Sequence, residues 1–234
     1  MVKRQPGLDE TLRAMRSTAA RDKISLIQAK QGLMMNLSPV TLTGRYVQLV
    51  PLLRDHVPEL AQVGSDPEIW KYMRYGVVDT EQKMSAWVEE LLRLQREGSD
   101  LPFTVVHRPS GRLAGATRFL NISQTNRSLE VGGTWYGIAF QRTVVNTEAK
   151  FLLLRYAFEE LNCVRVQFKT DLRNVRSQRA IERLGAVREG VLRDHMILPD
   201  GSLRSSVIYS ILPEEWLPVK TRLTGWINSA DIGQ

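Results

Sequence analysis

Beyond residue 35 the chain switches repeatedly between two hydrophobic periods, and this alternation restricts the folds that it can adopt. Period-two segments bounded by turn residues predict strands at residues 45–52, 102–122, 128–138, 164–171 and 187–212. Segments with a period of 3.6 predict helices at residues 54–63, 66–73, 80–98, 146–161, 174–186 and 213–227. Strands and helices mixed in this order favour an α+β or mixed α/β protein built around one sheet.

Single residues mark where several of these elements begin and end. Thr80 is placed to cap the helix that follows it, and Gly98 is placed to end that helix. The runs Pro109-Ser110-Gly111 and Pro199-Asp200-Gly201 are typical of hairpin turns. The pair Gly132-Gly133 inside a strand predicts a bulge or a close approach of another backbone.

The first 35 residues differ in composition from the remainder and are predicted to be a separate part. Residues 8–33 are polar with scattered apolar positions, which favours a weakly packed helix. Residues 1–36 also carry seven Lys and Arg against three Asp and Glu, out of a net charge of +7 for the chain. Two interpretations remain open. The segment is an accessory helix, or translation starts at Met34 or Met35 and the reading frame is over-extended.

Composition excludes several classes of function. The single Cys163 excludes an internal disulfide framework and a multi-Cys zinc site, and only three His are present, so we expect no metal centre. No apolar run reaches the roughly 20 residues that cross a bilayer, so we expect a cytoplasmic protein without a membrane partner. The basic balance favours an anionic partner such as a phosphorylated cofactor. Basic and aromatic residues are not interleaved, which argues against nucleic acid.

A strand–loop–helix junction around "QRTVVNTEAK", residues 141–150, is the first candidate site. The first turn of a helix has unpaired N–H groups and a partial positive charge, which suit a phosphate or pyrophosphate. Arg142 and Thr143 add a cation and a hydroxyl donor. Asn146 is predicted to be the N-cap of the helix. A second junction contains Asn174 and Ser177, whose plain role would also be helix capping.

Several ordered motifs resemble the GNAT-fold N-acetyltransferases, and within them the branch of RimJ/RimL-type ribosomal-protein N-terminal acetyltransferases. "LTGRYVQLVPL" resembles the opening strand of that branch, and "EVGGTWY" resembles its fourth strand. "QRTVVNTEAK" then falls at the acetyl-CoA pyrophosphate loop, and the signature Asn-x-x-Ser-x-x-Ala-Ile-Glu-x-Leu-Gly begins at Asn174. The resemblance covers residues 40–227. It implies a GNAT domain at residues 36–234 with a mostly antiparallel sheet of about seven strands, flanked by helices and splayed between strands 4 and 5.

The resemblance also implies roles for individual residues. The backbone of Trp135 and Tyr136 would pair with the pantetheine arm of acetyl-CoA. Main-chain amides would hold the pyrophosphate along the loop formed by Gln141, Arg142, Thr143, Val144, Val145, Asn146 and Thr147. Asn174 would hydrogen-bond the pantetheine or the phosphate end, and Ser177 would protonate the leaving thiolate. Glu130 is the candidate general base, with Asp194 and His195 as weaker alternatives, whereas Cys163 is expected in the core.

The loop lacks the glycines that the family pattern contains. Val144 stands where relatives have Gly, and a β-branched residue resists the positive φ that Gly allows. Two hypotheses follow. The chain is an acyl-CoA-dependent N-acyltransferase that acetylates a primary amine, either a protein N-terminus or a small amine. Alternatively, it is an impaired GNAT scaffold that binds CoA, nucleic acid or the ribosome. Homodimers occur in such families, so a homodimer is compatible with either hypothesis.

Overall fold

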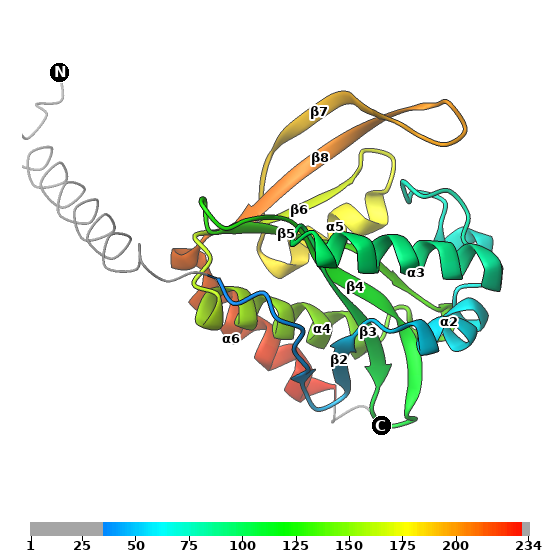
Figure 1. Cartoon of the computed structure of the whole chain (residues 1–234). Helices are drawn as coiled ribbons and strands as arrows, with labels where there is room; N and C mark the ends of the chain where they lie inside the picture. Colours follow the sequence, from blue (N-terminus) through cyan, green and yellow to red (C-terminus); the bar gives the residue numbers. More distant parts are fainter. Residues whose placement is uncertain (1–34, 231–234) are drawn as a thin grey trace, which may run out of the picture. The chain divides into compact units, whose positions relative to one another are not determined.

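A single twisted sheet forms the centre of the protein in the computed structural model, which describes residues 35–230 (Figure 1). The helix predicted at residues 8–33 lies outside the described residues. The eight strands follow the order β1-β2-β3-β4-β5-β6-β8-β7. Their bounds are β1 Leu42–Thr43, β2 Val47–Pro51, β3 Leu101–His107, β4 Arg112–Ser123, β5 Ser128–Tyr136, β6 Arg165–Asp171, β7 Val187–Ile197 and β8 Leu203–Ile211. The short β1 is the strand that the prediction of about seven strands did not include.

Helices cover both faces of the sheet. The α-helices are α2 Val57–Val63, α3 Glu81–Arg96, α4 Val144–Arg155, α5 Val175–Leu184 and α6 Pro213–Ser229. Short turns are η1 Arg54–His56, η2 Pro67–Ile69, η3 Ile138–Phe140 and the π-helical η4 Tyr156–Glu160. α2 packs with α3 and α4 packs with α6, and the β7–β8 hairpin projects beyond them (Figure 1). Every described helix is too short or too polar to span a lipid bilayer.

The predicted helix ends are correct at three points and wrong at one. Thr80 caps α3 by accepting a hydrogen bond from the Lys83 N–H at 3.3 Å, and Asn174 caps α5. Gly98 lies just after α3 and has the left-handed conformation, φ +76°, as expected of a residue that ends a helix. The prediction of Asn146 as the N-cap of α4 is wrong. Thr143 caps this helix, three residues earlier, because its Oγ1 accepts a hydrogen bond from the Val145 N–H at 3.3 Å.

The strands β5 and β6 form the one parallel pair among the described strands, and they pair over only three residues. Ser128–Glu130 lies beside Arg165–Gln167, and the register stops there although both strands continue. β5 is also kinked, because its register with β4 shifts between Ala116 and Arg118 opposite the Gly133 region. Gly133 has φ +57°, so the bulge that the glycine pair predicted is present. The sheet therefore splays between β5 and β6.

Three tryptophans form the centre of the core between α2, α3 and the sheet. Trp70 lies 4.9 Å from Trp135 and 6.4 Å from Trp87, measured between ring centroids. All three are buried, and this aromatic cluster holds the segment before α3 against β5. Cys163 is buried elsewhere in the core, as predicted, and burial raises the pKa of its thiol to about 12. A thiol of this kind is a core residue and not a nucleophile.

A buried carboxylate fixes the other side of the sheet. Glu148, in the first half of α4, accepts hydrogen bonds from the backbone N–H groups of Arg45, Tyr46 and Val47 at 2.7, 2.6 and 2.6 Å. Gly44 is required beside it, because a Cβ there would lie 2.5 Å from the Glu148 carboxyl carbon. The start of β2 and the head of α4 are thus locked together across about 100 residues of sequence.

Candidate functional site

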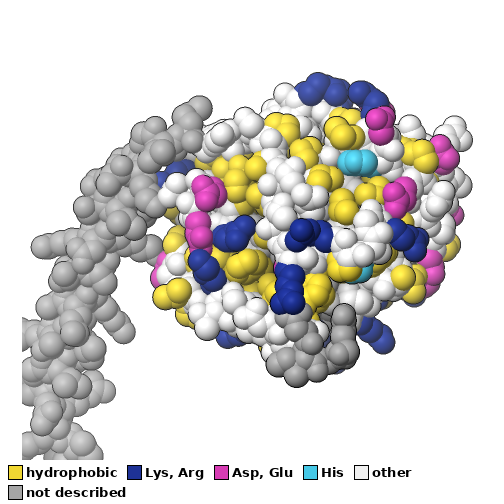
Figure 2. Space-filling model, turned by 90° about the horizontal axis from the view of Figure 1, so that it is seen from below, with side chains coloured by type: hydrophobic (Ala, Val, Ile, Leu, Met, Phe, Trp, Pro, Cys, Tyr) yellow, Lys and Arg dark blue, Asp and Glu magenta, His cyan; other side chains and the backbone are white. Residues whose placement is uncertain are grey.

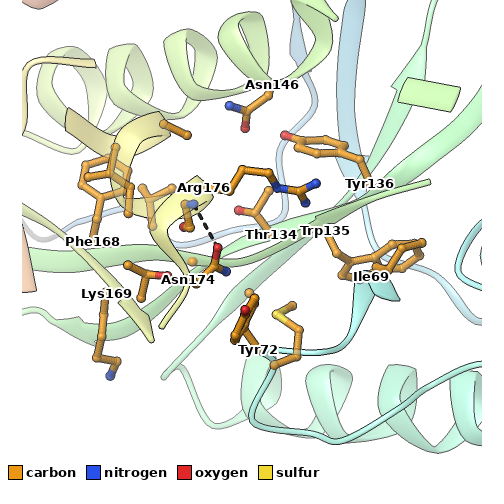
Figure 3. A pocket seen from close by; sticks show the side chains of 18 of the residues that line it. Ile69, Tyr72, Thr134, Trp135, Tyr136, Asn146, Phe168, Lys169, Asn174 and Arg176 are labelled. Atoms are coloured by element: carbon orange, nitrogen blue, oxygen red, sulfur yellow. Dashed lines mark hydrogen bonds between the residues drawn. The ribbon is translucent and has the colours of Figure 1, made fainter. Parts of the chain in front are cut away.

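A cavity of about 750 Å³ opens where β5 and β6 separate. Its walls come from β5, the loop before α4, the carboxyl end of β6, the head of α5 and the segment before α3. Figure 3 shows this pocket, with Asn146 and Tyr72 at opposite ends of the view. The predicted site residues that line it are Glu130, Trp135, Tyr136, Gln141, Arg142, Thr143, Asn146, Asn174 and Ser177. Val144, Val145 and Thr147 do not line it.

The loop before α4 achieves its turn without glycine because the positive φ falls on a different residue. Arg142 has φ +62°, whereas Val144 is the first residue of α4 and is not among the residues with positive φ. A β-branched residue is tolerated there because helical backbone angles suit it. The Thr143 hydroxyl donates to the Phe140 carbonyl at 2.8 Å and caps the helix, so it is occupied within the protein. In this structure the Thr143 hydroxyl, predicted as a donor to the ligand, is thus engaged with the protein backbone.

Cations surround this end of the cavity. Arg142, Arg176 and Arg183 all line it. Arg176 donates to the Gln141 side chain at 2.8 Å, and Gln141 donates to the Tyr136 carbonyl at 2.9 Å, which connects α5 to the loop. A helix N-terminus flanked by arginines is suited to bind a phosphorylated ligand.

The exposed edge of β5 offers further hydrogen-bonding groups. Among the described strands β5 has no partner on its β6 side beyond Glu130, so the backbone from Val131 onward is open to the cavity on that edge. The Tyr136 hydroxyl is buried and has no hydrogen-bond partner among the described residues. Burial raises the pKa of Tyr136 well above its usual range, so it is a neutral donor. An extended amide-containing ligand would satisfy both the strand edge and this hydroxyl.

At the head of α5, Asn174 and Ser177 lie beside each other. The Asn174 Oδ1 atom accepts from the Ser177 N–H at 3.0 Å, drawn as a dashed line in Figure 3. Capping therefore uses the oxygen of Asn174 and leaves its amide nitrogen for a ligand. The Ser177 side chain is half-buried at the cavity wall.

Glu130 is buried, with 3% of its surface exposed. It therefore differs from an ordinary glutamate on a strand, which lies at the surface. Its Oε2 atom accepts from Asn121 at 3.0 Å and from Gln167 at 3.1 Å, and Lys169 Nζ lies 3.3 Å away. A Cβ built on Gly132 would lie 3.3 Å from the other oxygen, Oε1. The carboxylate is thus held in one orientation at the cavity wall, with one oxygen already occupied.

Lys150 is a cavity residue that the sequence reasoning missed. It lies in α4 at 7% exposed, and its Nζ donates to Thr134 Oγ1 at 2.6 Å. The Thr134 and Thr117 hydroxyls are in turn 2.8 Å apart. Burial lowers the pKa of Lys150 to about 7, and no nearby carboxylate contributes to that shift. The only local signal was that Lys150 directly precedes the apolar run Phe151–Leu154, which also fits a surface position.

The alternative acid–base candidates, Asp194 and His195, do not line this cavity, although His195 is within electrostatic reach of residues that do. Asp194 and His195 line a separate shallow depression on β7, together with Val191. The His195 ring bonds the Ser206 hydroxyl at 3.2 Å, and burial followed by nearby cations lowers its pKa. Met196, the next residue, is the one that reaches the main cavity. No cluster of three or more His, Cys, Asp or Glu that could hold a metal occurs within residues 35–230.

Comparison with known proteins gives a consistent result. The family model described as "Acetyltransferase (GNAT) domain" matches residues 47–187. The chain is 36% identical over 106 residues to "Putative ribosomal N-acetyltransferase YdaF" of Bacillus subtilis (strain 168), a match that covers 45% of this chain. It spans only 57% of that relative's length.

Solved structures extend the similarity to most of the chain. A "putative acetyltransferase" from T. thermophilus is 42% identical, with a TM-score of 0.73, covering 80% of this chain and 96% of that one. "Mycobacterium smegmatis RimJ in complex with CoA-disulfide" is 21% identical, with a TM-score of 0.69, covering 81% of this chain and 95% of that one. At that identity the second similarity shows a common fold.

Proposed function

The chain belongs to the GNAT acetyltransferase family, and from that premise we propose that it transfers the acetyl group of acetyl-CoA to a primary amine by direct attack. The acceptor amine is a protein N-terminus or a small molecule. YdaF is named as a ribosomal N-acetyltransferase, which makes a ribosomal-protein N-terminus in the cytoplasm one acceptor to test.

The cavity residues fit the cosubstrate. Main-chain amides at the head of α4, with Arg142 and Arg176 beside them, would hold the pyrophosphate. The open edge of β5 and the unsatisfied Tyr136 hydroxyl would hold the pantetheine arm. The Asn174 amide nitrogen, left over after capping, would donate to the same arm. Acetyl-CoA supplies an acetyl group activated as a thioester.

The transfer forms a C–N bond and breaks a C–S bond, so the amine must lose a proton and the sulfur must gain one. Glu130 is the candidate to accept the amine proton on Oε1, since its Oε2 is engaged by neighbouring side chains. Ser177 is the candidate to donate a proton to the sulfur, directly or through water. The cavity holds both reactants together, which supplies much of the rate.

The open strand edge beside a cationic helix N-terminus is the observation that carries this proposal. The alternative of an impaired scaffold depended on Val144 obstructing the loop, and Val144 does not line the cavity. On the face drawn in Figure 2, Lys and Arg side chains are dispersed among acidic and hydrophobic ones, so that face presents no continuous basic surface for nucleic acid.

The test is binding followed by turnover. Acetyl-CoA at millimolar concentration should raise the melting temperature of the purified full chain, and Asn174→Ala should reduce that shift. Thiol release is then measured against peptide N-termini, amino acids, polyamines and aminoglycosides. Ser177→Ala should lower kcat by about 10- to 100-fold while the melting shift persists. Absence of any melting shift would refute the proposal.

A further inference from the structure

Arg118 on β4 is the most deeply buried cation in the cavity wall, with 1% of its surface exposed. Its Nη2 atom donates to the Tyr75 hydroxyl, and its Nε atom lies 3.2 Å from Asp100 Oδ2 without the alignment of a hydrogen bond. Its Nη1 atom has no hydrogen-bond partner among the described residues. An arginine carries five N–H donors, and burying a charged donor without an acceptor is unfavourable. The Nη1 atom is therefore a donor in the cavity wall that no acceptor among the described residues satisfies.

Two further arginines lie at the same end of the cavity, and the segment Tyr72–Tyr75 connects all three. Arg204 is buried and donates through Nη1 to the Tyr72 carbonyl at 3.3 Å. Arg74 lies between the two tyrosines in sequence and also lines the cavity. Figure 3 shows Tyr72 at the end of the view opposite Asn146, a residue of the first turn of α4.

The carboxylates near these arginines do not compensate them fully. The carboxylate of Asp171 lies 3.9 Å from Arg204 Nε, but both of its oxygens are already bonded to Arg173 at 2.8 to 3.0 Å. Arg74 is within electrostatic reach of Glu90 and Asp100, but the ion pairs of these two carboxylates are with Arg93 and Arg118. Of the two carboxylates that line the cavity, Glu68 pairs with Lys71 at 3.3 Å and Glu130 pairs with Lys169 at 3.3 Å.

The cavity lining as a whole carries an excess of positive charge, which also favours an anionic group on the acceptor. Its lining contains two carboxylates, Glu68 and Glu130, and the following ten basic residues: Lys71, Arg74, Arg118, Arg142, Lys150, Lys169, Arg173, Arg176, Arg183 and Arg204. The phosphates of the cosubstrate would account for those near α4 and α5. The excess at the Tyr72–Tyr75 end is left for the acceptor. A polycation such as a polyamine would be repelled there.

We propose that the acceptor is an amine carrying a carboxylate within a few bonds of its amino nitrogen, and that Arg118 binds this carboxylate with Tyr75, Arg74 and Arg204 around it. This inference rests on the proposed function and specifies its substrate class. Gly133 supports the proximity to the reaction, because a Cβ there would lie 3.0 Å from Arg118 Nε and 3.4 Å from the Tyr75 hydroxyl. The carboxylate would thus sit beside the bulge on β5 where the open strand edge begins. Two sources share this chemistry: a free amino acid, and a peptide whose first residues include Asp or Glu.

The experiment compares matched acceptors with the full chain and acetyl-CoA. Each L-amino acid is assayed beside its carboxamide, and the peptide Asp-Ala-Ala-amide beside Asn-Ala-Ala-amide, with spermidine as a cationic acceptor. We expect kcat/KM to be at least about tenfold higher for the carboxylate member of a pair. Carboxamides have the less basic amine and so more of the reactive neutral form, which biases the comparison against the proposal. A preference for the carboxylate within the amino-acid pairs identifies a free amino acid as the acceptor, and a preference within the peptide pair identifies an acidic peptide.

A double variant that leaves the net charge unchanged tests whether Arg118 binds the acceptor carboxylate. Arg118→Met with Asp100→Asn removes both partners and so avoids an isolated buried carboxylate. It should abolish the carboxylate preference through a raised acceptor KM, while acetyl-CoA still raises the melting temperature. Arg112→Met, which removes an exposed arginine outside the cavity, should leave the preference unchanged.

The outcomes separate this inference from the proposed function. If carboxamides or spermidine react as well as carboxylates, the inference is wrong and the acyltransferase proposal stands. If acetyl-CoA binds but no acceptor releases thiol, calorimetry with CoA-saturated protein compares N-acetyl amino acids with their carboxamides. Binding that does not depend on the carboxylate, or no binding of either, overturns the inference. If acetyl-CoA itself does not bind, the proposed function fails with it.

Discussion

The Nζ atom of Lys150 lies 2.6 Å from the Oγ1 atom of Thr134, so α4 is tied to β5 by a buried amine at the wall of the cavity. Burial is the cause of the lowered pKa of Lys150, about 7 against an ordinary 10.5. Between these two pH values the unfolded chain holds one proton more than the folded chain, so the free energy of unfolding must rise with pH in that window. Below about pH 7 both states are protonated and this contribution is constant.

From about pH 7 to about pH 9 we therefore expect Lys150 to add about 2 kcal/mol to the free energy of unfolding. Denaturant titrations of the wild type and of Lys150→Met at three pH values across this window give the free energy of unfolding of each protein as a function of pH. The difference between the two pH dependences is the contribution of Lys150. Lys220→Met, at a lysine on the surface that pairs with Glu159, is the matched control and should follow the wild type. Parallel curves for the wild type and Lys150→Met would show that the folded lysine is not perturbed.

The Glu148 carboxylate should be one of the main stabilising groups in the protein. Glu148→Ala leaves three backbone N–H groups without an acceptor and should cost about 3–5 kcal/mol in free energy of unfolding. Glu148→Gln retains one acceptor oxygen and should cost less. Glu160→Ala, at an exposed glutamate, should stay within about 0.5 kcal/mol of the wild type. Chemical denaturation measures the free energy of unfolding of each variant. A decrease of less than about 1 kcal/mol for Glu148→Ala would mean that water replaces the carboxylate as the acceptor.

Gly133 and Gly111 form a matched pair for separating backbone strain from steric conflict. Both have positive φ, +57° and +68°, but a Cβ on Gly111 meets nothing within 4 Å whereas one on Gly133 meets Arg118. Each Ala substitution should cost about 1–2 kcal/mol for the left-handed backbone. Gly133→Ala should lower the melting temperature further and should reduce thiol release, while Gly111→Ala should retain activity. Equal effects on both measurements would indicate that Arg118 moves aside freely.

Val144→Gly tests whether the glycine-free loop is impaired. Because Val144 already has helical backbone, Gly there should destabilise the protein by about 0.5–1 kcal/mol and should not tighten acetyl-CoA binding. Arg142→Gly is the informative partner, since Arg142 holds the positive φ and Gly relieves it. Calorimetric titration with acetyl-CoA measures both variants. A gain in affinity of about tenfold for Val144→Gly would mean that the valine side chain obstructs the ligand.

Local signals predicted local structure well in this chain. Thr80 and Asn174 cap their helices because the bond reaches only three residues ahead, a distance visible in sequence. The same logic misplaced the start of α4, since Thr143 and Asn146 are both good capping residues and sequence does not rank them. The bulge at Gly133 was predictable because two adjacent glycines weaken a regular strand.

The chemistry of the site depended on contacts that sequence separation conceals. Glu148 lies near the start of the helix predicted at residues 146–161, yet the N–H groups that it binds belong to residues 101 to 103 positions earlier in the chain. The partner of Arg118 on the segment before α3 is 43 residues away, and no motif marks either residue. Lys150 is buried because β5 packs against α4, and the hydrophobic pattern of α4 alone does not predict this packing.

The seam between β5 and β6 has a mechanical consequence. Only three residue pairs, at Ser128–Glu130, join β5 directly to β6. A ligand lying along the open edge of β5 would bridge β5 and β6 beyond these pairs and restrict their movement relative to each other. Amide hydrogens from Val131 to Tyr136 would then exchange with solvent more slowly when the seam is filled.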